Sequence, residues 1–123
     1  MFANADSQMK LQLQRHSLGI DLGASSVKLA MINVQDEIIY WDYALNRGEP
    51  LELIKTLLKK MARDCFVIPD YTMCSGVGVS HLENLVEADT VSEMVAILEG
   101  SLLLDHKTAS VISIGGHLSL IHI

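Results

Sequence analysis

The sequence lacks a cluster of basic residues, a long uninterrupted apolar run and closely spaced cysteines. Lysine and arginine number 9 against 15 aspartates and glutamates, which gives a formal net charge of −6. Because phosphate neutralisation supplies most of the affinity for nucleic acids, we expect no nucleic-acid partner. The most apolar window, residues 91–104, is interrupted by Glu93 and Glu99. A transmembrane helix needs about 20 apolar residues, so we expect no membrane partner either.

The two cysteines, Cys65 and Cys74, have no C-x-x-C spacing. The N-terminal stretch MFANADSQMKLQLQRHS is polar and contains no apolar core of a signal peptide. We therefore interpret the cysteines as reduced thiols in a cytoplasmic protein. Free cysteine is among the most buried residue types, so both are expected to be small buried residues. The histidines show no spacing typical of a zinc site.

What the sequence does contain is typical of one globular domain with a modest core, since 50% of its 123 residues are apolar. Residues 1–16 are expected to form a flexible N-terminal extension. Apolar patterns and turn signals predict strands at 17–22, 26–34 and 37–45, a helix from Pro50, a strand at 71–77, a helix from a capping box at 90–93 to about 104, and a strand at 110–114. The order β-β-β-α-β-α-β predicts an α/β fold, with a mixed five-stranded sheet and helices packed on it.

The stretch GIDLGASSVKLA predicts a tight turn between two strands that carries the groups of a phosphate-binding site. It is not a P-loop, which needs G-x-x-x-x-G-K-[ST] and a following helix. Gly23 lets the backbone approach a ligand closely, and successive N–H groups of such a turn can form an anion-binding nest. Ser25 and Ser26 can donate hydroxyls to phosphate. Asp21 is placed to hold a hydrated Mg²⁺, and Lys28 adds a positive charge. A plain hairpin turn rich in small residues is the alternative.

Two further glycine elements follow predicted strands. Residues 75–79 (SGVGV) end the fourth strand, and residues 114–116 (IGG) end the fifth. Ligands of open α/β sheets bind beyond the carboxyl ends of parallel strands. Three glycine-bearing strand ends on one edge therefore favour a binding edge over a plain turn.

GIDLGASSVKLA resembles the first phosphate motif of the actin, sugar-kinase and Hsp70 superfamily of ATPases. The segment SGVGV, followed by SHLENLVEADTVSEMVAILEGSLLL and then SVISIGG, is similar to one branch, the BadF/BadG/BcrA/BcrD-type ATPases. These proteins activate 2-hydroxyacyl-CoA dehydratases and benzoyl-CoA reductases, and the likeness is greatest to the large acyl-CoA dehydratase activases. The resemblance covers about residues 17–117. It implies an actin-like (ribonuclease H-like) fold, with residues 17–117 as the first lobe of a truncated ATPase domain.

The resemblance also implies a chemistry: MgATP bound between two lobes, a [4Fe-4S] cluster at a homodimer interface, and an electron passed at low potential to a partner dehydratase or reductase. Asp21 would organise the Mg²⁺ and the attacking water, with Lys28 near the phosphates. The residues implied to contact the phosphates are Gly23, Ala24, Ser25 and Ser26 in the first motif, and Gly115 and Gly116 in the second. Glu93 matches a glutamate that recurs at the start of a helix in the family, although a helix cap explains it equally well.

The sequence departs from the family pattern in two respects. Ser113 and His117 stand where the second phosphate motif usually has an acidic residue and a glutamine. Loss of that carboxylate puts hydrolysis by this chain in doubt. The cluster cysteines and the adenosine-binding lobe of the family lie beyond the matched region, and neither Cys65 nor Cys74 matches a cluster position. The chain alone is therefore expected to be inactive and to bind MgATP weakly or not at all.

Two other functions stay open: a phosphotransferase of the same superfamily, and a nucleotide-sensing or scaffold lobe without hydrolysis, which Ser113 favours. The tail LSLIHI, residues 118–123, is similar to the translation of a transposon-end adapter, so we expect it to be non-native. Its alternating pattern also allows a genuine strand.

Overall fold

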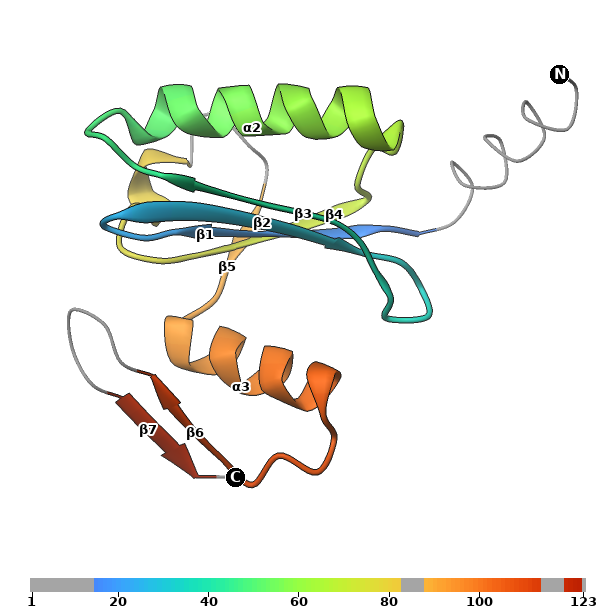
Figure 1. Cartoon of the computed structure of the whole chain (residues 1–123), viewed down its shortest axis with the longest axis vertical. Helices are drawn as coiled ribbons and strands as arrows, with labels where there is room; N and C mark the ends of the chain where they lie inside the picture. The colour runs from blue at the N-terminus through green and yellow to red at the C-terminus, as the bar shows by residue number, and fades with distance from the viewer. Residues whose placement is uncertain (1–14, 83–87, 114–118, 123) are drawn as a thin grey trace, which may run out of the picture. The chain divides into compact units, whose positions relative to one another are not determined.

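The computed structural model describes residues 15–82, 88–113 and 119–122 (Figure 1). The chain divides into two compact units, Met1–Thr90 and Val91–Ile123. Each unit has its own sheet, and the combination of strands and helices confirms the predicted α/β class. None of the helices in these ranges has the length and apolarity needed to cross a membrane.

A mixed five-stranded sheet in the order β3-β2-β1-β4-β5 forms the first unit. Its strands are β1 (Ser17–Leu22), β2 (Ser26–Ile32), β3 (Ile38–Leu45), β4 (Tyr71–Ser75) and β5 (Asp89–Thr90), and a short 3₁₀ helix, η1 (Val79–His81), follows β4. The first three strands pair antiparallel, which confirms the predicted meander. β4 is parallel to β1, and β5 is parallel to β4. The central strand β1 therefore joins an antiparallel half to a parallel half.

β2 ends two residues earlier than the sequence pattern predicts. The side-chain Oδ1 of Asn33 accepts hydrogen bonds from the N–H groups of Gln35 and Glu37, both at 3.0 Å. Asp36 adopts a left-handed conformation with φ of 61°. Asparagine side chains that bond to the nearby backbone in this way compete with strand pairing, so the chain turns directly after Ile32.

Helix α2 (Pro50–Cys65) packs on one face of this sheet (Figure 1). Pro50 stands in the first turn, where its missing N–H costs no helical hydrogen bond. The helix ends at Cys65, and the next residue, Phe66, takes the left-handed conformation common after the last turn. Its fully buried positions are Ile54, Leu57 and Met61. This spacing confirms the amphipathic helix that the sequence predicts, extended to Cys65.

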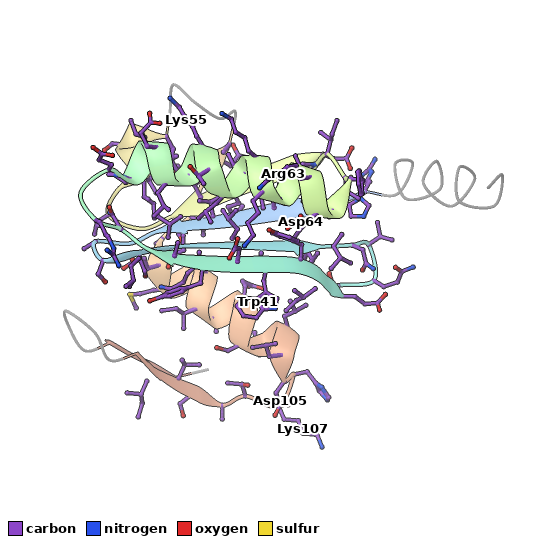
Figure 2. All side chains as sticks on the ribbon, turned by 45° about the horizontal axis from the view of Figure 1, so that its top comes forward. Trp41, Lys55, Arg63, Asp64, Asp105 and Lys107 are labelled. Atoms are coloured by element: carbon purple, nitrogen blue, oxygen red, sulfur yellow. The ribbon has the colours of Figure 1, made fainter. Side chains whose placement is uncertain are left out.

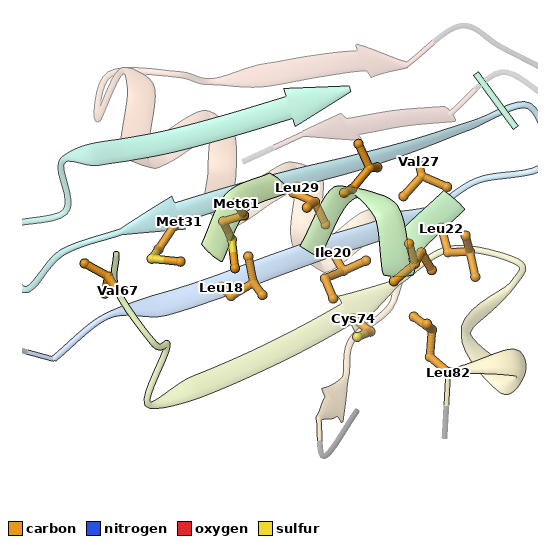
Figure 3. Close-up of a cluster of buried hydrophobic side chains, with 12 residues drawn as sticks. Leu18, Ile20, Leu22, Val27, Leu29, Met31, Met61, Val67, Cys74 and Leu82 are labelled. Atoms are coloured by element: carbon orange, nitrogen blue, oxygen red, sulfur yellow. The ribbon is translucent and has the colours of Figure 1, made fainter. Parts of the chain in front are cut away.

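Alternate residues of β1 and β2 face α2 and build the core of the first unit (Figure 3). These residues are Leu18, Ile20 and Leu22 on β1 and Val27, Leu29 and Met31 on β2, all buried. Side chains alternate across a strand, so Asp21 and Lys28 lie on the opposite face of the sheet. Trp41 also lies on the side away from α2, with 72% of its surface exposed (Figure 2).

The second unit contains α3 (Glu93–Leu104) and a separate antiparallel pair of strands, β6 (Ser110–Ser113) and β7 (Ser119–His122). The prediction that residues 110–114 form the fifth strand of the main sheet is therefore wrong, since the short β5 takes that place beside β4. β6 pairs with β7 instead, because pairing with a strand a few residues away costs little loop-closure entropy. The origin of the tail stays a prediction.

α3 begins two residues later than the predicted capping box. The Oγ of Ser92 accepts a hydrogen bond of 3.3 Å from the N–H of Val95, so Ser92 and not Thr90 caps the helix. Glu93 occupies the first turn, where a negative charge is favourable near the positive end of the helix dipole. A structural role therefore accounts for Glu93.

Ile54→Ala is expected to lower the free energy of unfolding by about 3 kcal/mol, because it leaves a cavity between α2 and the sheet. Ile54 is 0% exposed. Lys59→Ala on the exposed side of the same helix is the matched control, with an expected change within about 0.5 kcal/mol. Urea unfolding followed by circular dichroism measures both. Equal losses in the two variants would contradict the packing of α2 against the sheet.

Candidate functional site

Asp21 lies at the carboxyl end of β1, in register with Lys28 on β2 and with Ser75 on β4. The Nζ of Lys28 is 3.3 Å from Oδ2 of Asp21. The hydroxyl of Ser75 donates to Oδ1 of Asp21 across 3.4 Å. The side chains of Asp21 and Lys28 are 34% and 52% exposed, so solvent screens the ion pair and leaves the carboxylate accessible to a ligand.

The turn between β1 and β2 is closed by its own hydrogen bond, from the N–H of Gly23 to the carbonyl oxygen of Ser26 at 2.9 Å. Ala24 and Ser25 are exposed at its tip. Within the described ranges their N–H groups donate to no acceptor, whereas the side chain of Ser26 is buried. The N–H groups of Ala24 and Ser25 are thus the ones open to an anion, while Gly23 shapes the turn.

Two glycines hold the segment after β4 against the end of β1. Gly76 has a φ of +104°, and a Cβ on it would overlap the carbonyl oxygen of Leu22 and stand 2.8 Å from Oδ1 of Asp21. The N–H of Gly78 donates to that same Leu22 oxygen at 3.1 Å. A Cβ on Gly78 would also stand 2.5 Å from the Leu22 side chain. The glycines of SGVGV therefore permit a close backbone approach, which the sequence pattern alone does not distinguish from ligand contact.

The structure brings together part of the predicted set of site residues: Asp21, Gly23, Ala24, Ser25, Ser26 and Lys28. Gly115, Gly116 and His117 lie outside the described residues. Ser113 belongs to β6 in the second unit, where it pairs with Ser119. Two of the three predicted glycine-bearing strand ends, those of β1 and β4, do share one sheet edge. Ser75 was not predicted as a site residue, and its only sequence signal is its place before Gly76.

The acidic and cysteine side chains of the described residues limit which metal ion or cluster this chain could bind. Among the described residues there is no group of three or more His, Cys, Asp or Glu that could hold a metal ion. Cys74 is buried and Cys65 is half-buried. Burial raises the pKa of both thiols, which disfavours the thiolate that an iron–sulfur cluster requires. The cysteines do not fit a cluster, whereas the accessible carboxylate of Asp21 fits a Mg²⁺ that keeps most of its waters.

No family model and no curated protein matches the sequence. Solved structures do match it. Component A of (R)-2-hydroxyglutaryl-CoA dehydratase from Acidaminococcus fermentans has a TM-score of 0.75 and 21% identity, over 89% of this chain and 43% of its own. The activator of 2-hydroxyisocaproyl-CoA dehydratase from Clostridium difficile, solved with bound ADPNP, has a TM-score of 0.72 and 16% identity, over 88% of this chain and 41% of its own.

A Ppx/GppA family protein from Aquifex aeolicus is a more distant match, with a TM-score of 0.53 and 11% identity, over 89% of this chain and 52% of its own. At these identities the likeness shows the fold alone, an actin-like α/β fold, which confirms the predicted fold class. The chain spans less than half of the length of the two dehydratase activators. Those activators are the kind of protein that the sequence resemblance indicates.

Gly76→Ala is expected to destabilise the first unit by about 3 kcal/mol, because the new Cβ is strained by the positive φ and overlaps Leu22. Gly48→Ala is the matched control. Gly48 also has a positive φ, +92°, but nothing lies within 4 Å of the position that its Cβ would occupy. Strain without overlap is expected to cost about 1 kcal/mol. Urea unfolding of both variants gives the difference, and equal costs would show that residue 76 has room for a side chain.

Proposed function

We propose that this chain is the N-terminal ATP-binding lobe of a cytoplasmic ATPase that activates a 2-hydroxyacyl-CoA dehydratase or a benzoyl-CoA reductase. One observation carries the proposal. A carboxylate, an ammonium group and two open backbone N–H groups gather at the carboxyl end of the central strand of an actin-like fold. Two dehydratase activators share this fold, and one of them was solved with bound ADPNP.

Each group has a chemical role toward the phosphates of ATP. Asp21 would hold the hydrated Mg²⁺ and orient the attacking water. When bound, that ion neutralises the charge on the β- and γ-phosphates. The N–H groups of Ala24 and Ser25 donate to phosphate oxygens, in a turn that Gly23 and Ser26 shape. Lys28 adds a positive charge beside them.

The second phosphate motif, the cluster ligands and the partners of the proposed activity all lie outside the described residues. Gly115 and Gly116 are proposed to form the second phosphate motif. The ligands of a [4Fe-4S] cluster are proposed to come from outside this chain, since Cys65 and Cys74 do not fit that role. A homodimer and a dehydratase component are the proposed partners, and hydrolysis is proposed to drive the low-potential electron transfer between them.

Asp21→Asn is expected to remove the Mg²⁺-dependent part of nucleotide binding while leaving the fold intact. In the 123-residue chain, ADPNP is expected to bind more weakly than about 100 µM, because one lobe supplies only part of the contacts that enclose a ligand. Adding Mg²⁺ should tighten this binding at least about twentyfold in the wild type, since the ion would be held by the carboxylate and the phosphates together. Amide shifts of residues 23–26 in NMR titrations measure both affinities.

Asp36→Asn, in the exposed turn after β2, is the matched control and should retain the Mg²⁺ effect. In the asparagine variant at position 21, ADPNP without Mg²⁺ should bind as well as in the wild type or slightly better, because a negative charge near the phosphates is gone. An equal Mg²⁺ effect in both variants would contradict the role of Asp21. Absence of any ADPNP binding in the wild type would contradict the proposed function itself.

A further inference from the structure

The carboxylate of Asp21 has a different neighbour at each oxygen. Oδ2 is next to the ammonium group of Lys28, and Oδ1 is next to the hydroxyl of Ser75. The two neighbours respond in opposite ways to an arriving cation. An ammonium group repels a divalent ion and has to leave, whereas a neutral hydroxyl keeps donating to an ionised carboxylate. Of the two contacts, the one with Ser75 is therefore compatible with a bound ion.

Ser75 is held in place by the strands around it. It is the last residue of β4, 7% exposed, and directly in register with Asp21 on the parallel neighbour β1. A buried hydroxyl requires a hydrogen-bond partner, and in the part of the chain that the structure describes its partner is Oδ1 of Asp21. The backbone cannot relax away from this arrangement easily, because Gly76 is packed against the carbonyl oxygen of Leu22.

The contact of 3.4 Å is long for a hydroxyl and a carboxylate, whose usual separation is about 2.5–3.0 Å. Hydrogen bonds in active sites are often long without ligand and shorten when the ligand is bound. Here the ammonium group of Lys28 attracts the other oxygen of the same carboxylate toward β2. Removal of that attraction allows the carboxylate to move toward Ser75.

We propose that Ser75 is a positioning residue, whose hydroxyl fixes the orientation of the Asp21 carboxylate so that its other oxygen faces the nucleotide-bound ion. The identity of that ion rests on the proposed function, but the orientation of Asp21 does not. A group that forms a hydrogen bond to a metal-ligating side chain typically contributes a factor of about 10–100 to the metal affinity. The hydroxyl of Ser75 is expected to act at the lower end of that range, since Asp21 is partly exposed.

Ser75→Ala in the 123-residue chain is expected to weaken the binding of Mg²⁺·ADPNP about tenfold and that of metal-free ADPNP less than about twofold. Ser75→Thr keeps the hydroxyl and should bind Mg²⁺·ADPNP within about threefold of the wild type, while Ser75→Cys, a poor donor of similar size, should resemble the alanine variant. Ser17→Ala is the matched control, on the same face at the other end of β1, and should change neither affinity. NMR titrations give all the constants.

A second measurement needs no nucleotide. Three-bond coupling constants report the χ1 rotamer of Asp21, which is expected to be single in the wild type and the threonine variant and averaged in the alanine and cysteine variants. A single Asp21 rotamer in all four proteins would overturn the inference and leave the proposed function standing. If the wild type binds no ADPNP at all, the proposed function fails, and the rotamers alone decide the role of Ser75.

Discussion

The carbonyl oxygen of Leu22 and the backbone of Gly76 approach so closely that no side chain fits between them. This approach, closed by the hydrogen bond from Gly78 to the same oxygen, aligns the ends of two parallel strands. The turn after β1 and the segment after β4 consequently lie next to each other. Ser75 meets Asp21 at this point, so the geometry of the candidate site depends on two positions that have no side chain at all.

The rigidity of the site comes from the other face of the same strand. Ile20 and Leu22, on either side of Asp21, are 2% and 0% exposed and pack beneath α2. Because side chains alternate, a shift of one residue in the pairing of β1 would expose both apolar residues and bury the carboxylate. The free energy of core packing therefore also specifies that Asp21 lies on the face of the candidate site. The apolar face of β1 and helix α2 support the site without contributing a charged group to it.

Much of this arrangement follows from local sequence. The meander, α2 and the turn at Gly23 are predictable because apolar periodicity, Pro50 and the glycine each constrain the chain locally. The placement of β6 cannot be predicted in this way. An edge strand of the main sheet and a strand of a separate hairpin have the same apolar pattern in the sequence, and only the pairing partner distinguishes them. The role of Ser75 was missed for a similar reason. A serine before a glycine carries no signal until the parallel register places it opposite Asp21.

The ion pair of Asp21 and Lys28 is weak by its nature. Two unit charges near 3.3 Å interact by about 1 kcal/mol or less when solvent reaches both of them, as it does here. On the proposed function, Asp21 would hold a Mg²⁺ in place of the ammonium group of Lys28, and the weakness of the ion pair would make that exchange cost little. Lys28 would then be available to the phosphates bound with that ion.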